Sequence, residues 1–554
     1  MKKLFTSIFL MGSLLSFGQD DEMKEIFVKE IGHSFHITGH NDEDDYTYAS
    51  NDKEVSVLKN SNGEIKWNKR YKEITPEINK VDEIIPLWDA DALFVFDRKL
   101  GTDKMACIDI HNGNLLWVSG KYQNVEEDNI VYIKELDAFA VTTKSALVMI
   151  KARTGEEMWQ TQKFKGIVGY YVIKSDGMMT MINMKSSVLG SIFSGMKNQI
   201  MKINTKTGEV IWDQTYRGMA ERKVLTREKL MSMDIKKDKI FLYLNGIQVF
   251  DYNSGAPIWA MAYDQTPEVV KKPANTTSFG AYGVVADAVV DGDHVYVLDM
   301  INKRKQYVKK YELNTGALVW TSPEIKDARA IPNMFVHNGK VVLQVGGAVE
   351  VQYIQRTRES DGSVTITRAV ETQNVKPFNV QAFDANTGTQ VWESEKMKKG
   401  ITNAFIHGDN VIICSGKALY SMEVATGTEK YEMPLGKDKI GLADRIVGYH
   451  DNVAIIGEKG VSMRKMKDGD LIGSAKYKRA TPLSYNGKVI YKDALALITP
   501  KSDVGVFNLD KMTLKKFDAR KGATSYLSED GTNLFVLESG GMLRKSKFTK
   551  LGTK

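Results

Sequence analysis

Three histidines close together near the start of the chain are the residues best suited to metal chemistry. His33, His36 and His40 are followed directly by four acidic residues at 42–45, and imidazole and carboxylate groups are common metal ligands in proteins. Side chains alternate along a strand, so His36 and His40 share one face while His33 lies on the other. Two interpretations follow: a metal site where the backbone bends, or a polar edge strand leading into an acidic loop. We predict the second and assign no metal ligands.

Other reactive groups show no catalytic pattern. The two cysteines, Cys107 and Cys414, are far apart in the chain and are expected to be buried and unpaired. No Cys-x-x-Cys-His motif for covalent haem is present. None of the 69 acidic residues stands in a group that differs from turn-capping aspartates and solvated faces. The sequence therefore predicts no catalytic residues and no cofactor.

The secondary structure of the chain is indicated by a repeated pair of residues, a glycine followed four positions later by a tryptophan. Glycine takes the left-handed last position of a hairpin turn without a steric clash. A tryptophan four residues later lies in the following strand, where its indole can bury a large area against a neighbouring sheet. We therefore predict one hairpin per pair, with the tryptophan docking between repeats. The glycines are Gly63, Gly113, Gly155, Gly208, Gly255, Gly316 and Gly388, and the tryptophans that follow them, in the same order, are Trp67, Trp117, Trp159, Trp212, Trp259, Trp320 and Trp392.

The repeat continues in weaker form beyond the tryptophans. Gly427 is followed by Tyr431, Gly469 by Gly473, and residues 508–512 form a copy without glycine. Eight intervals separate Gly63 from Gly469, so the mean period is (469 − 63)/8, about 51 residues, which suits a four-stranded propeller blade.

Polar turns followed by short runs rich in β-branched residues, as at 291–298, 338–343 and 408–413, supply the remaining strands. The predicted fold class is all-β: a β-propeller of four-stranded antiparallel blades, with ten repeat motifs and about 8–11 blades. Eight blades with accessory sheets, one ring of ten or eleven, and two packed toroids are all compatible with this count. The run Ile26–Val28 is expected to complete the last sheet.

One copy of the repeat motif resembles the motif of a known family. Residues Ala382–Trp392 match at every fixed position the repeat Ala-x-Asp-x-x-Thr-Gly-x-x-x-Trp of the PQQ-like β-propellers, those of the pyrroloquinoline-quinone type. The copies at 204–212 and 314–320 match well, while Ser254 or Asn112 replaces the threonine in others. The resemblance covers most of residues 54–520 and implies the fold, but a fold does not determine a function.

The resemblance implies two kinds of function. Quinone dehydrogenases of this type need a carboxylate base, a calcium ion and a bound quinone, and many carry adjacent cysteines, which this chain lacks. The propeller subunit of outer-membrane protein assembly machinery is similar in repeat type and lacks cofactor chemistry. This chain is longer and has no lipid-carrying cysteine near its start.

The first residues have the pattern of an export signal. Lys2 and Lys3 precede an apolar run at 4–17, and Ser16 and Gly18 offer small residues for cleavage. We predict a signal peptide at 1–18 and a single propeller domain at 19–554, the alternative being a short N-terminal anchor. No other apolar stretch is long enough to cross a bilayer. A periplasmic location is expected, possibly with outer-membrane association or secretion, and the mild net charge of +7 does not suggest nucleic-acid binding.

Two insertions interrupt the repeat, and binding surfaces are often grafted at such places. The first, at 177–201, is rich in methionine, which suits adaptable protein contacts. Its candidate partner-binding residues are Met181, Met184, Ile192 and Phe193. A packed cover over one end of the propeller and a soft-metal site are the alternatives.

The second insertion, at 349–380, predicts a long hairpin. Two alternating runs at 351–357 and 363–370 flank a turn at 360–362. A hairpin longer than its blade would project from the rim and offer open edges to a partner strand, while a harmless solvated projection is the alternative. Its candidate partner-binding residues are Tyr353, Ile354, Arg356 and Ile366.

These observations favour a non-enzymatic, exported scaffold for protein–protein interaction at the cell envelope, possibly a subunit of an outer-membrane assembly or transport complex. The expected partners are envelope proteins. The alternatives are a quinone- and calcium-dependent dehydrogenase and a propeller that binds carbohydrate or another polymer.

Overall fold

The computed structural model describes residues 21–554 except 98–103, 122–129, 144–145, 185–197, 217–231, 237, 245, 263–275, 283, 302–304, 359–363, 484–487 and 542–543. The predicted signal peptide therefore lies outside the described residues. The chain divides into two compact units. Unit 1 contains residues 1–29, 434–538 and 547–554, and unit 2 contains residues 30–433 and 539–546.

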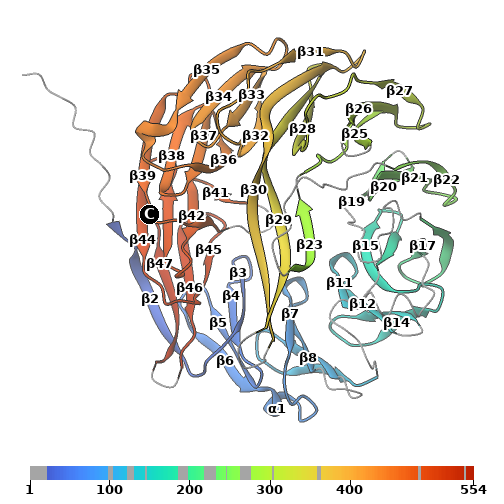
Figure 1. Cartoon of the computed structure of the whole chain (residues 1–554). Helices are drawn as coiled ribbons and strands as arrows, with labels where there is room; N and C mark the ends of the chain where they lie inside the picture. Colours follow the sequence, from blue (N-terminus) through green and yellow to red (C-terminus); the bar gives the residue numbers. More distant parts are fainter. Residues whose placement is uncertain are drawn as a thin grey trace, which may run out of the picture. The chain divides into compact units, whose positions relative to one another are not determined.

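Unit 2 contains eight sheets, whose strands are labelled in Figure 1 where there is room. Their strands, sheet by sheet, are β3 (Ile37–Asn41), β4 (Tyr46–Ser50), β5 (Glu54–Lys59) and β6 (Ile65–Arg70); β7 (Glu83–Leu87), β8 (Ala92–Asp97), β9 (Lys104–Asp109) and β10 (Leu115–Ser119); β11 (Ile130–Ile133), β12 (Ala138–Thr142), β13 (Leu147–Lys151) and β14 (Glu157–Thr161); β15 (Ile167–Ile173), β16 (Met178–Met184), β17 (Gln199–Asn204) and β18 (Val210–Thr215); β19 (Ser232–Lys236), β20 (Lys239–Leu244), β21 (Gly246–Asp251) and β22 (Pro257–Ala262); β24 (Val289–Asp291), β25 (His294–Ile301), β26 (Lys305–Glu312) and β27 (Leu318–Thr321); β23 (Thr276–Tyr282), β28 (Asn333–His337), β29 (Lys340–Arg358), β30 (Val364–Asp384) and β31 (Gln390–Glu393); β32 (Asn403–His407), β33 (Asn410–Cys414), β34 (Ala418–Glu423) and β35 (Glu429–Pro434).

Unit 1 carries three further sheets. Their strands are β36 (Ala443–Tyr449), β37 (Asn452–Gly457), β38 (Gly460–Lys465) and β39 (Leu471–Lys476); β1 (Asp21–Glu22), β40 (Thr481–Pro482), β41 (Ile490–Tyr491), β42 (Ala494–Ile498), β43 (Val504–Asn508) and β44 (Thr513–Phe517); β2 (Lys24–Ile31), β45 (Thr524–Leu527), β46 (Asn533–Glu538) and β47 (Ser546–Gly552).

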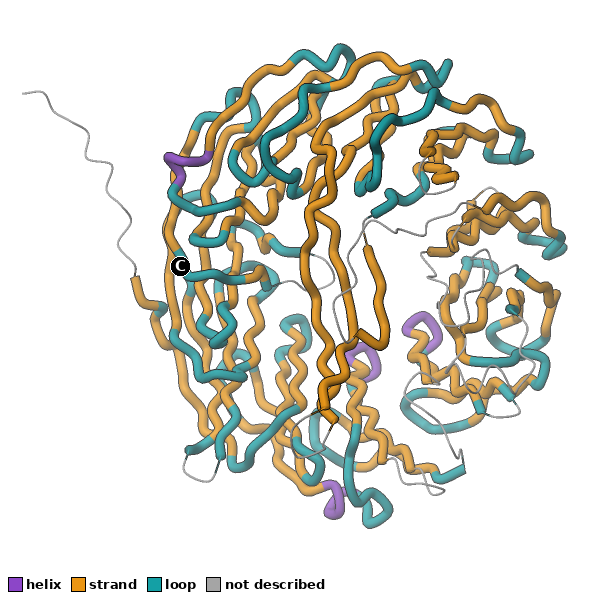
Figure 2. The backbone as a smooth tube through the Cα atoms, in the orientation of Figure 1, coloured by secondary structure: helices purple, strands orange, loops and turns teal. Residues whose placement is uncertain are grey.

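Helices are few and short among the described residues, as Figure 2 shows. They are α1 (Tyr71–Ile74) and the 3-10 segments η1 (Trp88–Ala90), η3 (Lys134–Leu136) and η4 (Leu435–Asp438). The predicted fold class is confirmed: an all-β propeller of four-stranded antiparallel blades, with eleven sheets in the described part of the chain. Only ten repeat motifs were visible in the sequence. The eleventh sheet takes its outer strand, β2, from the other end of the chain, so no hairpin turn joins that strand to its neighbour β47. The prediction that the run Ile26–Val28 completes the last sheet is also confirmed.

Two turns within each blade are tied together by a backbone hydrogen bond. In the second sheet the turn between β7 and β8 ends at Asp91, whose φ of 52° is left-handed, a conformation that aspartate tolerates better than most residues. The carbonyl of Asp91 accepts the N–H of Ile110 at 2.9 Å, three residues before Gly113. The same bond recurs as Ala152 N–H to the carbonyl of Asp137, at 2.8 Å. The glycine turn is therefore held by a contact within its own blade, in addition to the packing of the neighbouring sheet.

The core lies between successive sheets. Met149 and Trp159 of one sheet pack with Met179 and Ile203 of the next, and all four are buried. Similar clusters form between the other neighbouring sheets of each unit. Because the blades bury their apolar residues against one another, the surfaces that remain for function are turns, edges and insertions.

Candidate functional site

Each of the seven tryptophans lies against the glycine of the following repeat. Trp159, for example, packs on Gly208, and its indole Nε1 donates to the carbonyl of Thr205 at 2.7 Å. Across the seven docks this donor distance is 2.7–3.2 Å, and the acceptor is always three residues before the glycine. The docking tryptophans are Trp67, Trp117, Trp159, Trp212, Trp259, Trp320 and Trp392, and their acceptors, in the same order, are Ile110, Ala152, Thr205, Tyr252, Leu313, Ala385 and Val424.

The indoles are buried to different degrees in these docks. Trp67, Trp159, Trp212 and Trp392 are buried, whereas Trp117, Trp259 and Trp320 are partly buried and pack against the core clusters between their sheets. All seven keep the same donor bond and the same glycine contact. The structure therefore places every tryptophan of the repeat in a dock between neighbouring repeats.

The docking glycines are fixed by two constraints. Their φ angles lie between 68° and 75°, where a side chain is strained. A Cβ built on any of them would also lie 2.5–2.7 Å from an indole atom, closer than atoms can approach. Glycine and tryptophan therefore serve blade packing and offer no open chemistry. The seven receiving glycines are Gly113, Gly155, Gly208, Gly255, Gly316, Gly388 and Gly427; Gly63, the first glycine of the repeat, has a φ of 72°.

Two buried lysines were missed by the sequence reasoning. Lys310 Nζ donates to the carbonyl of Ala385 at 2.9 Å, the same carbonyl that Trp320 Nε1 reaches at 3.2 Å. Lys202 Nζ donates to the carbonyl of Tyr252 at 3.3 Å and lies 3.5 Å from the centre of its ring. Burial lowers the pKa of Lys202. Both lysines reinforce a tryptophan dock with a second donor.

A signal for these lysines was present in the sequence. They stand six residues before Gly208 and Gly316, where other repeats carry apolar residues such as Val57 and Ala382. A charged residue at a position that is apolar in other repeats indicates that the side chain there makes a polar contact in the core, in place of the usual apolar packing.

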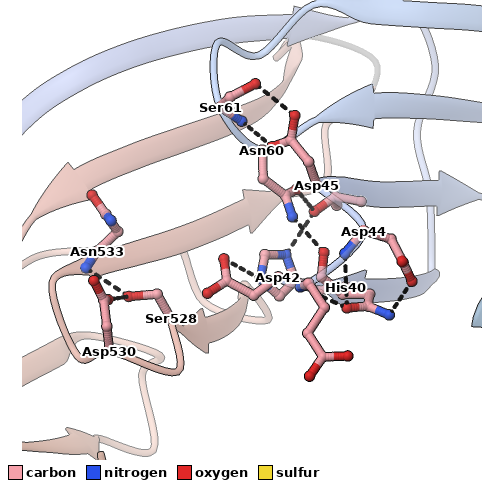
Figure 3. A network of polar contacts seen from close by, with 12 residues as sticks. His40, Asp42, Asp44, Asp45, Asn60, Ser61, Ser528, Asp530 and Asn533 are labelled. Atoms are coloured by element: carbon pink, nitrogen blue, oxygen red, sulfur yellow. Dashed lines mark hydrogen bonds and ion pairs between the residues drawn. The ribbon is translucent and has the colours of Figure 1, made fainter. Parts of the chain in front are cut away.

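The histidines do not come together. His33 is buried and its Nε2 lies 2.8 Å from Ser56 Oγ, whereas His40 Nδ1 lies 2.8 Å from Thr47 Oγ1. Figure 3 shows His40 in a polar network that includes Asn60, with Asp45 bonded to Ser61 in the same turn region. Ser528, Asp530 and Asn533 in that view belong to unit 1 and form a separate turn. His33 and His40 thus bond to hydroxyl groups of neighbouring strands rather than to each other.

The described residues show no carboxylate-rich group of the kind that a calcium ion beside a quinone would use. They contain no group of three or more His, Cys, Asp or Glu side chains that could hold a metal ion. Calcium beside a quinone would need several carboxylate and carbonyl oxygens in one place. Cys107 and Cys414 form no disulfide and are fully buried, as predicted, and burial raises the pKa of the Cys107 thiol to about 12, which suppresses thiolate chemistry.

The methionine-rich insertion at 177–201 is mostly regular blade structure where it is described. Its two ends form β16 and β17, which pair with each other, so that Met181 lies opposite Met201. Met181 is fully buried in the core between two sheets, which corrects its place among the partner contacts, because a strand residue facing the neighbouring sheet has no exposed surface. The side chain of Met184, and all of Ile192 and Phe193, lie outside the described residues.

The second insertion forms the predicted hairpin. β29 and β30 pair in one continuous antiparallel register from Gly347↔Val375 to Arg358↔Val364, and the turn at 359–363 lies outside the described residues. Tyr353, Ile354, Arg356 and Ile366 take their places in this register, with side chains outside the described set. We call residues 347–358 and 364–375 the hairpin extension. In Figure 1 it is the yellow pair of strands that continues well past its blade.

A small core holds the base of the hairpin extension. Val349, Val351 and Val375 pack with Val284 and Ala330, and all five are buried. The register shifts between Val345 and Gly347, where the strands leave the blade. At this point the N–H of Ala348 donates to the carbonyl of Ile401 at 2.8 Å, and that of Gly346 to Ala330 at 2.7 Å. The extension is therefore anchored to the rest of unit 2 at its base.

The two edges of the hairpin extension differ. β23 pairs with β29 from Thr276↔Gln355 to Tyr282↔Glu350, so the expectation of open edges on both sides is wrong for the β29 side. The next strand on the other side, β31, pairs with β30 only at 381–383. Within the described residues, no strand other than β29 pairs with β30 at 364–375. This edge is long and carries neither proline nor lysine, two residues that commonly protect edges, and its charged residues are Arg368 and Glu371.

The comparison with protein families gives a clear result. The family model described as "Outer membrane protein assembly factor BamB" matches residues 32–168 and 244–516 of the chain. The chain belongs to this family. The match covers the hairpin extension and every docking tryptophan except Trp212, and it confirms the resemblance to the PQQ-like repeat. A comparison with curated proteins found no match.

Three similar solved structures are distant from the chain in sequence. BamB from Moraxella catarrhalis is 12% identical with a TM-score of 0.26, covering 81% of this chain and 95% of that one. A eukaryotic initiation factor is 9% identical with a TM-score of 0.37 (76% and 96% covered). A europium-containing methanol dehydrogenase is 12% identical with a TM-score of 0.27 (66% and 80% covered). TM-scores this low carry no argument about function.

Among the described residues, no helix is long and apolar enough to span a membrane.

Proposed function

We propose that the chain is an exported, non-enzymatic propeller scaffold that binds a protein partner at the cell envelope through its hairpin extension. Membership of a family described as an outer-membrane assembly factor supports this reading. The signal-like sequence at 1–18 supports export to the periplasm. The absence of a fitting carboxylate group among the described residues gives a dehydrogenase no support.

The observation that carries the proposal is the open edge of β30 on an anchored extension. An extended segment of a partner can add to such an edge through main-chain hydrogen bonds, with specificity from alternate side chains. The base is buried and fixed, so a partner meets a strand that is already ordered, which lowers the entropy lost on binding. The blades themselves use their tryptophans and turn glycines for packing, and their described outer strands are shorter than this edge.

Removal of the extension tests the proposal. Gln352 pairs with Val370 and Tyr353 with Ala369, so residues 353–369 can be replaced by Asn-Gly, a two-residue turn that closes an antiparallel pair. We expect this variant to stay folded and to recover at least about tenfold less partner from cross-linked envelopes. Ile258→Ser, at an exposed position on β22 outside the extension, is the matched control and should recover the partner normally. Equal recovery by both variants would disprove docking at the extension.

A further inference from the structure

Residues 21–31 form an arm that lies on two different sheets of the protein. β1 runs parallel to β44, with Asp21 opposite Lys515 and Glu22 opposite Lys516. β2 is the outer strand of the last sheet, next to β47. Between them, the N–H of Met23 donates to the carbonyl of Lys516 at 3.2 Å, and the Met23 side chain is buried with Ala496 and other residues of both sheets. We call residues 21–31 the arm.

The arm is attached differently from the other outer strands. In the repeats with a tryptophan, the outer strand follows its neighbour through a tight glycine turn and is held by the indole dock. β2 has neither, because its neighbour β47 comes from the opposite end of the chain. Six of its eight residues are exposed, and Ile26 and Val28 are 51% and 41% exposed. Release of the arm therefore breaks strand pairing and the apolar contacts of Met23, Phe27 and Ile31, while no turn joins β2 to β47.

The side chains that do hold the arm form a recognisable pattern. The backbone register places position 21 opposite Lys515 and acidic Glu22 opposite basic Lys516, and opposite charges on neighbouring strands favour such an alignment. Phe27 meets Phe548 edge to face, with ring centres 5.5 Å apart. The acceptor edges thus select an extended segment with two acidic residues followed by a buried methionine and then a phenylalanine.

We propose that the edges of β44 and β47 form a strand-acceptor site, at which the arm of a second copy of the chain takes the place of the chain's own arm. A second copy carries the same sequence and would make the same contacts, so exchange changes only the path of the chain into and out of the arm. The product is an arm-exchanged dimer. The inference concerns unit 1 edges and stands whether or not the hairpin extension binds an envelope protein.

The acceptor site is tested on the full chain with a fluorescent peptide of residues 21–31 as the probe. We expect slow, saturable binding as the peptide displaces the resident arm. The peptide with Phe27→Ala should bind at least about tenfold more weakly, since a partly buried phenylalanine and its ring contact with Phe548 are lost. The peptide with Asp21→Lys and Glu22→Lys should bind weakly to the natural chain but better than the natural peptide to the chain with Lys515→Glu and Lys516→Glu. Absence of binding, or binding that ignores this charge exchange, overturns the site.

The identity of the natural occupant is tested by the mass of the full chain in solution. Light scattering over a concentration series should show a dimer that grows with concentration and is dissociated by excess natural peptide but not by the Phe27→Ala peptide. A chain that binds the peptide yet stays monomeric throughout the series overturns the second copy as occupant. Neither measurement uses the envelope partner, so failure here is distinct from failure of the proposed scaffold function.

Discussion

The seven tryptophan docks of unit 2 and one junction in unit 1 solve the same packing problem in opposite ways. In unit 2 a tryptophan supplies the bulk and the next repeat supplies a bare glycine. In unit 1 the position of the tryptophan is Gly473, and the position of the turn glycine is Met512, whose Cβ lies 3.2 Å from a Cβ built on Gly473. Met512 keeps the left-handed turn with a φ of 55°. The large and the small residue have changed sides.

This exchange shows what the repeat conserves. The turn geometry and the filled volume between the sheets persist, while the residue that fills the volume can come from either side. Met512 accepts a conformation that costs a non-glycine residue about 1–3 kcal/mol, and its flexible side chain fits the irregular gap. The glycine–tryptophan spacing is therefore one version of a more general rule about volume.

Trp159→Ala should show the largest effect. It removes a nearly buried indole and its hydrogen bond to Thr205, and a cavity remains against Gly208. We expect a loss of about 3–5 kcal/mol in the free energy of unfolding of unit 2. Met512→Ala, at a partly buried side chain, should cost unit 1 about 1–2 kcal/mol. Urea unfolding followed by tryptophan fluorescence and circular dichroism measures both.

Equal losses in the two variants would contradict the comparison. It would mean that the indole dock contributes no more than the methionine that replaces it, and that the blades owe their stability to strand pairing alone. Tryptophan fluorescence reports on unit 2, which holds all seven docking residues, while circular dichroism reports on both units.

Two substitutions, Gly473→Trp and Met512→Gly, would give the unit 1 junction the tryptophan and glycine of the unit 2 docks. Gly473→Trp alone should overpack the space that Met512 already fills, at a cost of about 1–3 kcal/mol. Met512→Gly alone should leave that space empty, although it relieves the left-handed strain. In the double variant the two changes should compensate, with a coupling of about 1–2 kcal/mol in a double-mutant cycle measured by thermal or urea unfolding. Strict additivity of the two changes would show that residues 473 and 512 do not share one packing site.

The sequence predicted the parts of the fold that depend on local spacing. Glycine at a left-handed turn and tryptophan in the next strand are both local requirements, so the hairpins, the propeller class and the long hairpin could be derived. The Gly473–Met512 junction was seen only as a broken repeat, because its compensation links residues in successive repeats. The burial of Met181 was missed for a similar reason: methionine in a strand looks the same whether the neighbouring sheet covers it or not.

The candidate site was predicted less completely than the fold. Alternation and an Asp-Gly turn revealed the hairpin extension, but β23, which covers one of its edges, comes from a segment some 70 residues earlier in the chain, and its pairing depends on the tertiary fold. The arm was expected to close the last sheet, yet its second contact, β1 on β44, rests on two residues and a parallel register. Pairings between distant short segments leave no periodic pattern to read.

The smallest expected difference between the two kinds of turn is in their response to acid. Hydrogen bonds from the N–H groups of Ser254 and Asn386 lower the pKa of Asp251 and Asp384, respectively, below the ordinary value of 3.8. A carboxylate with a lowered folded-state pKa stabilises the fold above its unfolded pKa, and this contribution is lost as the pH falls through the folded value. In the Met512 turn the same place is held by Asn508, whose Oδ1 accepts the N–H of Lys511 at 2.7 Å and does not titrate.

Asp251→Asn and Asp384→Asn should therefore make unit 2 turns behave like the Met512 turn. Asparagine keeps an oxygen acceptor for the turn N–H groups, so Asp251→Asn should change stability at neutral pH little, whereas Asp384→Asn also removes the ion pair with Lys340 at 3.1 Å. In both variants the loss of stability between about pH 5 and pH 2 should become shallower. Thermal unfolding across that range measures the slope for each variant and for the natural chain. An unchanged acid slope would mean that these exposed carboxylates are too well solvated for their turn hydrogen bonds to matter, and that the aspartate and asparagine versions of the turn are equivalent.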